Sequence, residues 1–188
     1  MKDLRGTKVD GSLAIRTMHN GLFHSVALTA SEEGIIRLEL FETQEMDGVV
    51  LQPGTAGAAK IADQAIDELE QYFNGNLCFF TVPINLEGVT DFQRRVLRHV
   101  AQIPLGAVET YGEVALYIGK PNSARAVGGA LARNPIAIRI PCHRVVAHCG
   151  HLNGFSAVGG IGTKEKLLLH EGVRVIDKRV VMVDRWKA

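Results

Sequence analysis

The sequence predicts an α+β protein with two domains: a small mixed domain over residues 1–88 and a mostly helical domain over residues 89–188 that contains a helix-turn-helix. The length of 188 residues suits one large domain or two small ones, and 46% apolar with 22% charged residues allows packed cores. Residues 1–90 hold 6 basic and 13 acidic residues, whereas residues 91–188 hold 15 basic and 7 acidic ones. This asymmetry predicts that a polyanion binds the second half only.

The first domain is predicted to begin with three strands, because three segments are rich in β-branched and apolar residues. They cover residues 12–18, 22–30 and 35–42. Asn20-Gly21 lies between the first two segments, and this dipeptide is the strongest short signal of a hairpin turn. We therefore expect a small antiparallel sheet at the start of the chain.

A helix and a fourth strand are predicted to complete this domain. The helix covers residues 58–73, and Gly75 can cap its end. Its apolar face contains Ile61, Ala65, Leu69, Tyr72 and Phe73. Residues 78–84 (CFFTVPI) are predicted to form a strand that places Cys78 in the core, and residues 86–89 are predicted to be the linker.

Two helices with capping boxes are predicted to open the second domain. In such a box the first side chain accepts from the backbone of the third helical residue, whose own side chain bonds back. Thr90 and Gln93 have this spacing before a helix that buries Phe92, Val96, Leu97 and Val100. Thr110 and Glu113 have it before a short helix that ends at Gly119.

The next helix is predicted to start at Asn122-Ser123 after a four-residue turn, which fits a helix-turn-helix. Gly128 and Gly129 in its interior each cost up to about 1 kcal/mol relative to alanine. Close packing of helix on helix explains them, and so does approach of the helix backbone to a narrow DNA groove. In the second case Arg125 would probe the base stack; in the first it is an ordinary surface residue.

A strand at residues 136–140 is predicted to lead into Pro141-Cys142-His143. A thiol is a nucleophile only as thiolate, and a neighbouring imidazole can remove its proton. Adjacent residues of a strand point to opposite faces, so Cys142 and His143 need a turn to converge. The alternative is a buried thiol beside a surface histidine.

Glu171 is the last residue of a helix predicted over residues 164–171. A carboxylate there faces the negative end of the helix dipole, which is unfavourable. A role in orienting His143 explains this position, and a solvated helix-end carboxylate is the alternative.

A zinc site is a weaker hypothesis for the same region. Cys142, His143, His148, Cys149 and His151 lie close together in the sequence. Zinc sites space their first pair of ligands by two to four residues, and the two cysteines are further apart. We therefore expect no metal.

The cellular location is predicted to be cytoplasmic, or nuclear in a eukaryote. Three cysteines do not form a disulfide framework, which favours a reducing compartment. No apolar run reaches the roughly 18 residues of a membrane helix, and residues 1–12 lack the apolar core of a signal peptide.

Several motifs of the second domain follow one another over about residues 90–172. They are TYGEVA at 110–115, RAVGGALARNP at 125–135, IPCHRVV at 140–146, GF at 154–155 and TKEKLLLHEG at 163–172. Together they resemble the O6-alkylguanine-DNA alkyltransferase family, also called methylated-DNA–protein-cysteine methyltransferases. The first domain resembles the family's ribonuclease-H-like lead domain in outline.

The resemblance implies a catalytic role for each of several residues. Cys142 would accept the alkyl group, His143 would act as its base through a water, and Glu171 would hold the imidazole. Tyr111 would donate a proton to the departing guanine, although alone it reads as a core aromatic. Asn134, which alone reads as a helix-end cap, would tie the DNA-binding helix to the active-site strand.

The resemblance also implies how DNA would be held. Arg125 would replace the flipped nucleotide in the stack. The other DNA-binding residues would be Ser123, Ala124, Gly128 and Gly129. The substrate pocket would be lined by Val145, Phe155 and Ser156. The loop at residues 155–160 is longer than in the shortest members, and Cys78 alone does not fit the zinc site that some members hold in the first domain.

The implied function is repair of double-stranded DNA by direct reversal. A monomer would bind the minor groove, flip O6-alkylguanine (and O4-alkylthymine) into a pocket, and transfer the alkyl group to Cys142. A thioether gives water no leaving group, so each molecule would act once, and no cofactor is needed. A non-catalytic lesion-binding protein is the alternative, but such members lack the reactive cysteine. A transcription factor would need base-reading side chains on its recognition helix, and a Cys-His hydrolase would need an oxyanion hole.

Overall fold

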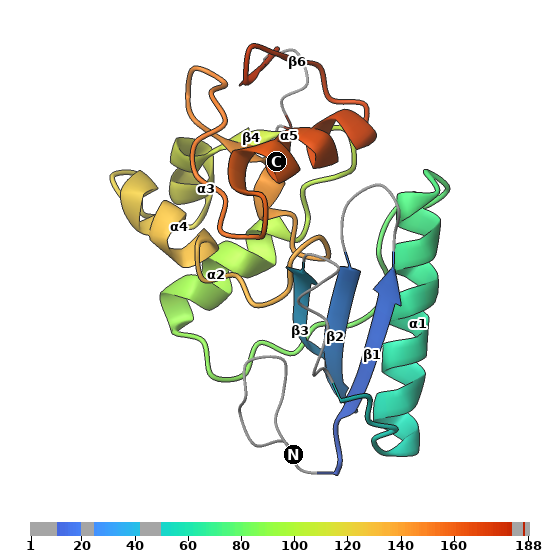
Figure 1. Cartoon of the computed structure of the whole chain (residues 1–188). Helices are drawn as coiled ribbons and strands as arrows, with labels where there is room; N and C mark the ends of the chain where they lie inside the picture. The colour runs from blue at the N-terminus through green and yellow to red at the C-terminus, as the bar shows by residue number, and fades with distance from the viewer. Residues whose placement is uncertain (1–10, 20–24, 42–49, 182–185, 187–188) are drawn as a thin grey trace. The chain divides into compact units, whose positions relative to one another are not determined.

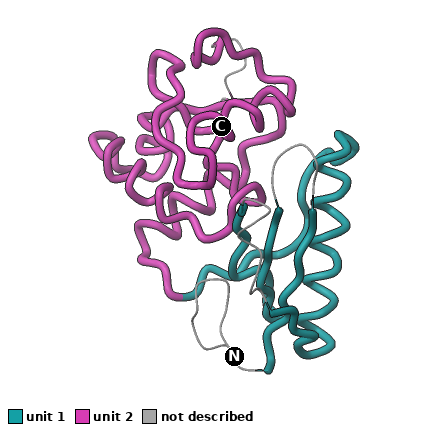
Figure 2. Tube along the Cα trace, in the orientation of Figure 1, with its two compact units in different colours: residues 1–87 teal, residues 88–188 magenta. Residues whose placement is uncertain are grey.

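The computed structural model describes residues 11–19, 25–41, 50–181 and 186. The chain divides into two compact units, residues 1–87 and residues 88–188 (Figure 2). The predicted turn at Asn20-Gly21 and residues 1–10 lie outside the described residues. Among the described helices, none has the length and apolar character that crossing a membrane requires.

The first unit contains an antiparallel sheet in the order β1-β2-β3, which confirms the three predicted strands (Figure 1). The strands are β1 (Ala14–His19), β2 (Ser25–Ser31) and β3 (Gly34–Phe41). Every residue of the central strand β2 is buried. The helix α1 (Ala56–Phe73) contacts all three strands and supplies the other side of the core.

The helix α1 ends before the predicted glycine and buries four of the five predicted apolar residues, whereas Ile61 is only partly buried. The Thr55 side chain accepts a hydrogen bond from the backbone N–H of Ala58. Gly75 follows the helix with a φ of 72°, the left-handed conformation that glycine adopts without strain. The buried positions are Ala58, Ala62, Ala65, Glu68, Leu69, Tyr72 and Phe73. Of these, only Glu68 is not explained by apolar periodicity.

The prediction of a strand at residues 78–84 is wrong, and Glu68 explains why. Its carboxylate accepts hydrogen bonds from the backbone N–H groups of Thr81 at 3.0 Å and Val82 at 3.1 Å. Pro83 has no N–H to donate. The Glu68 carboxylate therefore uses two backbone donors of the segment and Pro83 lacks a third, so these groups cannot pair with a neighbouring strand.

The same segment also leaves Cys78 exposed, which corrects its predicted place in the core. Phe79 is 69% exposed beside it. A single parallel bridge between Ile35 and Ile84 is what joins the segment to the sheet. The apolar residues of this segment therefore pack only partly against α1 and β3.

The second unit begins with the helix α2 (Asp91–Val100), whose predicted capping box is half formed. The Thr90 side chain accepts from the backbone N–H of Gln93, as predicted. The Gln93 side chain instead donates to the carbonyl oxygens of Ala130 at 3.4 Å and Arg133 at 2.9 Å. The buried amide thus fastens α2 to a later helix rather than to its own cap.

The helix α3 (Tyr111–Tyr117) has the complete capping box that was predicted. Glu113 accepts from the backbone N–H of Thr110 at 2.8 Å, and Thr110 accepts from the backbone N–H of Glu113. The short strand β4 (Glu109–Thr110) immediately precedes it and pairs in parallel with β5 (Val145–Val146). This pairing places the start of α3 beside the segment that follows Cys142.

The helix α4 (Ala124–Leu131) follows Ser123, as predicted. The connection is residues 118–123, longer than the predicted four residues because α3 ends at Tyr117. The helices α2, α3 and α4 contact one another and form the helical cluster of this unit (Figure 1).

The predicted strand at residues 136–140 is also wrong, because the segment forms a tight turn. The backbone N–H of Ile140 donates to the carbonyl of Ile136 at 2.9 Å, and Ile138 has a φ of 66°. The Asn134 side chain closes this turn, accepting from the Ile136 N–H at 3.0 Å and donating to the Ile140 carbonyl at 2.8 Å.

The helix α5 (Gly160–His170) begins four residues before the predicted start, and the hairpin of β6 (Val175–Ile176) and β7 (Arg179–Val180) follows it. The local core that joins these elements contains Val108, Val146, Leu152, Leu168, Val173 and Val180.

Candidate active site

A pocket of about 550 Å³ opens between the start of α3, the helix α4, Cys142 and the loop at residues 153–156. Among the residues singled out from the sequence, its walls include Tyr111, Ala124, Arg125, Gly128, Cys142, Phe155 and Ser156. Further lining residues that the sequence analysis missed are Leu131, Ala132, Asn153 and Gly154. The pocket thus joins four motifs that are separate in the sequence.

Cys142 starts a 3-10 helix, η2 (Cys142–Arg144), and is 8% exposed. The predicted turn at the Cys-His pair is therefore present. Burial raises the pKa of the Cys142 thiol, while a hydrogen bond from Asn134 and the charge of Lys164 oppose that rise. The Asn134 Nδ2 lies 3.3 Å from the sulfur. Because the net shift is upward, the thiol is protonated at rest and needs a base to become a nucleophile.

His143 is buried behind the cysteine, and its Nε2 lies 2.7 Å from Oε1 of Glu171. Burial lowers the pKa of His143, against the opposing effect of Glu171, so the ring is neutral near pH 7. Burial alone would raise the pKa of Glu171, but His143 and Arg144 bring it below its ordinary value. The ionised carboxylate can only accept, so the ring proton lies on Nε2.

That tautomer leaves Nδ1 of His143 with a free lone pair. This atom is buried and has no hydrogen-bond partner among the described residues. A neutral imidazole with an unused acceptor nitrogen is what a general base requires.

Arg144 is a buried residue of the site that the sequence analysis missed. Its guanidinium forms two hydrogen bonds to the Glu171 carboxylate, at 2.7 and 2.8 Å, and also donates to the carbonyl of Ile103. This fork-to-fork pairing compensates the charge of Glu171 at the helix end, where the helix dipole would disfavour it. Glu171 is therefore not a solvated helix-end residue: its side chain is fully buried.

Lys164 is a second buried charge that the sequence analysis missed. Its side-chain amine donates to the carbonyls of Val145 at 2.7 Å and Asn153 at 3.3 Å. Burial lowers the pKa of Lys164 to about 8, while the Cys142 sulfur opposes this shift. Val145 itself is not among the described residues that line the pocket, and its carbonyl is occupied by this lysine.

Tyr111 is the first residue of α3, and its hydroxyl donates a hydrogen bond to the Asn153 carbonyl at 3.2 Å. Burial, followed by the charge of Cys142, raises the pKa of Tyr111 to about 12. The hydroxyl therefore remains a proton donor at neutral pH.

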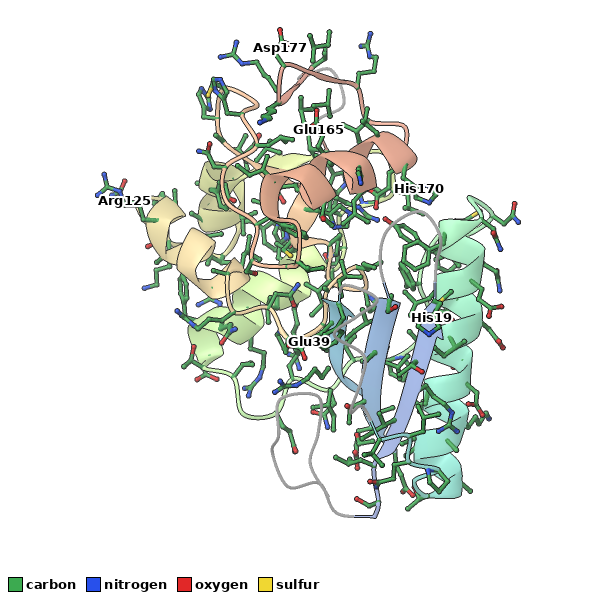
Figure 3. All side chains as sticks on the ribbon, in the orientation of Figure 1. His19, Glu39, Arg125, Glu165, His170 and Asp177 are labelled. Carbon is green, nitrogen blue, oxygen red and sulfur yellow. The ribbon has the colours of Figure 1, made fainter. Side chains whose placement is uncertain are left out.

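The two glycines of α4 have room for a side chain within the described protein. A Cβ at Gly128 would meet the Tyr111 ring at 3.8 Å, and one at Gly129 would meet Arg133 at 4.0 Å, both ordinary contacts. Close packing of helix on helix therefore does not require them. Arg125 is exposed at the outer end of the same helix (Figure 3). Ser123 makes no side-chain cap, so its hydroxyl does not serve α4.

In the described part of the chain no three His, Cys, Asp or Glu side chains come together in a way that could hold a metal ion. Four of the five residues that were weighed as zinc ligands divide between two places. Cys142 and His143 belong to the pocket and its buried support, whereas Cys149 and His151 lie against each other elsewhere.

Comparison with known proteins agrees with this arrangement. The 6-O-methylguanine DNA methyltransferase DNA-binding domain matches residues 91–173. A methylated-DNA–protein-cysteine methyltransferase of Methanosarcina barkeri is 39% identical over 143 residues, which cover 76% of this chain and 87% of the relative. One of Mycobacterium bovis is 50% identical over 104 residues, but there the match covers only 55% of this chain and 61% of the relative.

Solved structures resemble the chain over more of its length. The crystal structure of Mycobacterium tuberculosis OGT in complex with DNA superposes with a TM-score of 0.69 and 38% sequence identity. It covers 84% of this chain and 91% of the solved one, so the likeness extends through both units.

Proposed function

Because the chain belongs to the family of methylated-DNA–protein-cysteine methyltransferases, we propose that it repairs DNA by moving an alkyl group from O6 of guanine to Cys142. The observation that carries this proposal is the buried Cys142, which faces the pocket while the His143–Glu171 pair lies behind it. Mass spectrometry of the intact protein after incubation with duplex DNA that contains O6-methylguanine tests it. One added methyl group per molecule is the expected result.

The chemistry begins with proton transfer from the Cys142 thiol, through a water, to the free Nδ1 of His143. The imidazolium that forms is stabilised by Glu171. The sulfur lone pair then forms a bond to the alkyl carbon while the carbon–O6 bond breaks. The departing guanine takes a proton from Tyr111, and the proton held by His143 restores the tyrosine. The products are a thioether and guanine, and the protein is consumed.

A base inside a duplex cannot reach a buried thiol, so the lesion must flip out of the stack. We propose that α3 and α4 act as a helix-turn-helix, that α4 enters the minor groove, and that the excess of basic residues after residue 90 contacts phosphates. A monomer fits this mode, and the same pocket would take O4-alkylthymine. The meander and helix of the first unit would form the ribonuclease-H-like domain.

A non-catalytic lesion-binding protein is the second candidate. It would need the pocket but not the base behind the cysteine. The buried His143–Glu171–Arg144 group, which leaves Nδ1 of His143 as an unused acceptor, favours the catalytic function.

Arg125→Ala is expected to slow repair of duplex DNA at least tenfold, because the arginine no longer fills the stack after flipping. Tenfold corresponds to about 1.4 kcal/mol, which is part of the few kcal/mol that flipping costs. Reaction with free O6-benzylguanine, which needs no flipping, should be nearly unchanged. The measurement is the ratio of the two rate constants in the wild type and the variant.

The matched control is Arg98→Ala, which removes the same charge from an exposed position on α2. It should change the ratio of rate constants far less than Arg125→Ala does. Arg125→Lys should restore little, since an ammonium does not stack as a planar guanidinium does. If the ratio for Arg125→Ala equals that of the wild type, Arg125 has no role in flipping and is an ordinary surface residue.

Gly129→Ala is expected to stabilise the fold while it weakens duplex binding. Alanine is favoured in a helix interior by about 0.5–1 kcal/mol, and its methyl group has room inside the protein. If the backbone of α4 approaches the DNA groove closely, the same methyl group would clash with the DNA. Urea unfolding and DNA titration measure the two effects separately.

Gly162→Ala in α5 is the control for this pair of effects, because a Cβ there also has free space. It should raise the free energy of unfolding without changing affinity for DNA. If Gly129→Ala binds duplex as tightly as the wild type, close approach of α4 to DNA is ruled out.

A further inference from the structure

A second cluster of reactive side chains lies outside the alkyl-acceptor pocket. Cys149 is exposed and its sulfur lies 2.9 Å from Nδ1 of His151. A separate pocket of about 590 Å³ contains both residues, and it shares no lining residue with the pocket of Cys142. Its other walls are Ile176, Asp177, Arg179, Val180 and Val181.

Backbone hydrogen bonds hold this cluster in place. The N–H of Val180 donates to the carbonyl of Gly150 at 2.9 Å, and the N–H of Leu152 donates to the carbonyl of Lys178 at 3.0 Å. The β6–β7 hairpin is therefore fastened to the segment that carries Cys149. Its tip, where Asp177 lies, projects from the top of the second unit (Figure 3).

Arg179 decides which ring nitrogen of His151 carries the proton. Its Nη2 lies 3.4 Å from Nε2 of His151. A guanidinium can only donate, so Nε2 must be the acceptor and a neutral ring holds its proton on Nδ1. That proton points at the sulfur of Cys149 and hydrogen-bonds to the thiolate. The hydrogen bond from His151 lowers the pKa of the Cys149 thiol to about 7.

We propose that Cys149 is a second reactive thiol that forms reversible mixed disulfides with small disulfides bearing an amino-acid group. The pocket presents one guanidinium, from Arg179, and one carboxylate, from Asp177. This pair of opposite charges suits a ligand that carries both a carboxylate and an ammonium. The proposal is independent of alkyl transfer, because it involves neither Cys142 nor its pocket.

The reaction is thiol–disulfide exchange, which needs no other oxidant. The Cys149 thiolate attacks one sulfur of the small disulfide, a new S–S bond forms, and the old one breaks. The second half leaves as a thiolate and takes up a proton. A thiol of low pKa is also a good leaving group, so a cellular thiol readily reverses the modification.

The gain in rate from ionisation alone is modest. At pH 7 a thiol of pKa about 7 is half ionised, roughly 16 times more than an ordinary thiol of pKa about 8.5. Its lower intrinsic nucleophilicity removes about fivefold of that advantage. A net gain of about threefold is expected, so the pH at which the rate is half-maximal is the sharper measurement.

The test is to treat the whole protein with oxidised glutathione between pH 5.5 and 9.5, quench with acid, and quantify each cysteine peptide by mass spectrometry. Modification of Cys149 should have its midpoint near pH 7. Exposed Cys78 of the same chain serves as the internal reference.

His151→Ala should raise the Cys149 midpoint by more than one pH unit, and Arg179→Ala should raise it less. Arg179→Ala should also reduce the preference for oxidised glutathione over the neutral bis(2-hydroxyethyl) disulfide. A Cys149 midpoint equal to that of Cys78, or unmoved by His151→Ala, would overturn the proposal. Equal reaction with the charged and neutral disulfides in the wild type would overturn the assigned ligand class.

Discussion

Cys142→Ser is expected to abolish alkyl transfer and to leave binding of alkylated duplex DNA intact. A serine hydroxyl is far less acidic than a thiol, so His143 cannot activate it as a nucleophile in the same site. Binding should persist because α3, α4 and the basic surface are unchanged. The measurements are the mass of the intact protein after incubation with damaged duplex and the dissociation constant for that duplex.

Cys149→Ser is the matched control for this experiment, since it removes the other thiol of the unit from a pocket that the chemistry does not use. It should transfer the alkyl group as fast as the wild type, with one group per molecule on the Cys142 peptide. Alkylation of Cys149 in the wild type, or repair of many lesions by one molecule, would refute the proposed reaction. Loss of binding in a folded Cys142→Ser protein would refute the separation of binding from chemistry.

Local signals in the sequence predicted the elements that local chemistry determines. The capping box of Thr110 and Glu113 forms because both partners lie within one turn. The Cys-His pair and the misplaced carboxylate at Glu171 indicated a catalytic group, and the structure brings His143 and Glu171 together. The capping box depended on residue type and spacing alone, whereas the residues left the roles of Cys142, His143 and Glu171 open and the family resemblance assigned them.

The two failures have a common physical cause: a polar side chain took backbone groups that a strand would have paired with another strand. Residues 78–84 and 136–140 both read as apolar strands. Glu68 takes the backbone donors of the first segment, and Asn134 closes the second into a turn. From sequence alone a polar residue is predicted to be exposed, and hydrophobic periodicity does not indicate which buried group it would bind.

The same limit hid Arg144 and Lys164. Both are charged residues that rank among the most exposed types, yet both are buried here. Arg144 is buried because Glu171 neutralises it, and Lys164 because two carbonyl oxygens accept its protons. One signal was present: Arg144 directly follows the Cys-His pair.

Glu171→Gln is expected to impair both stability and transfer. The amide keeps the shape of the carboxylate but leaves the buried Arg144 without its counter-charge, and breaking a buried pair costs about 3–5 kcal/mol. One end of the amide also becomes a donor that faces donors on Arg144 and His143. With the His143 ring no longer fixed, the transfer rate should fall by about 10²–10⁴. Urea unfolding and single-turnover kinetics measure the two losses.

The control is Glu165→Gln, which makes the same change within α5, the helix that Glu171 follows, and outside this buried group (Figure 3). It should alter neither quantity by a comparable amount. Arg144→Met with Glu171→Gln should recover part of the lost stability, because the uncompensated charge is gone, without recovering transfer. A double variant as unstable as Glu171→Gln alone would contradict the assignment of the loss to the unpaired arginine.

The pH dependence of this stability difference follows from the ionisation of Glu171. Its pKa is lower in the folded protein than in the unfolded chain, because His143 and Arg144 outweigh the effect of burial. The stabilisation is therefore fully present above the unfolded pKa of about 4.3 and is lost as the pH falls toward the folded value. The difference in free energy of unfolding between wild type and Glu171→Gln should stay constant from pH 8 to pH 5 and shrink below about pH 4. A difference that is the same at pH 3 as at pH 7 would mean that the amide destabilises the site through its shape, and that the charge of Glu171 does not hold Arg144 and His143 in place.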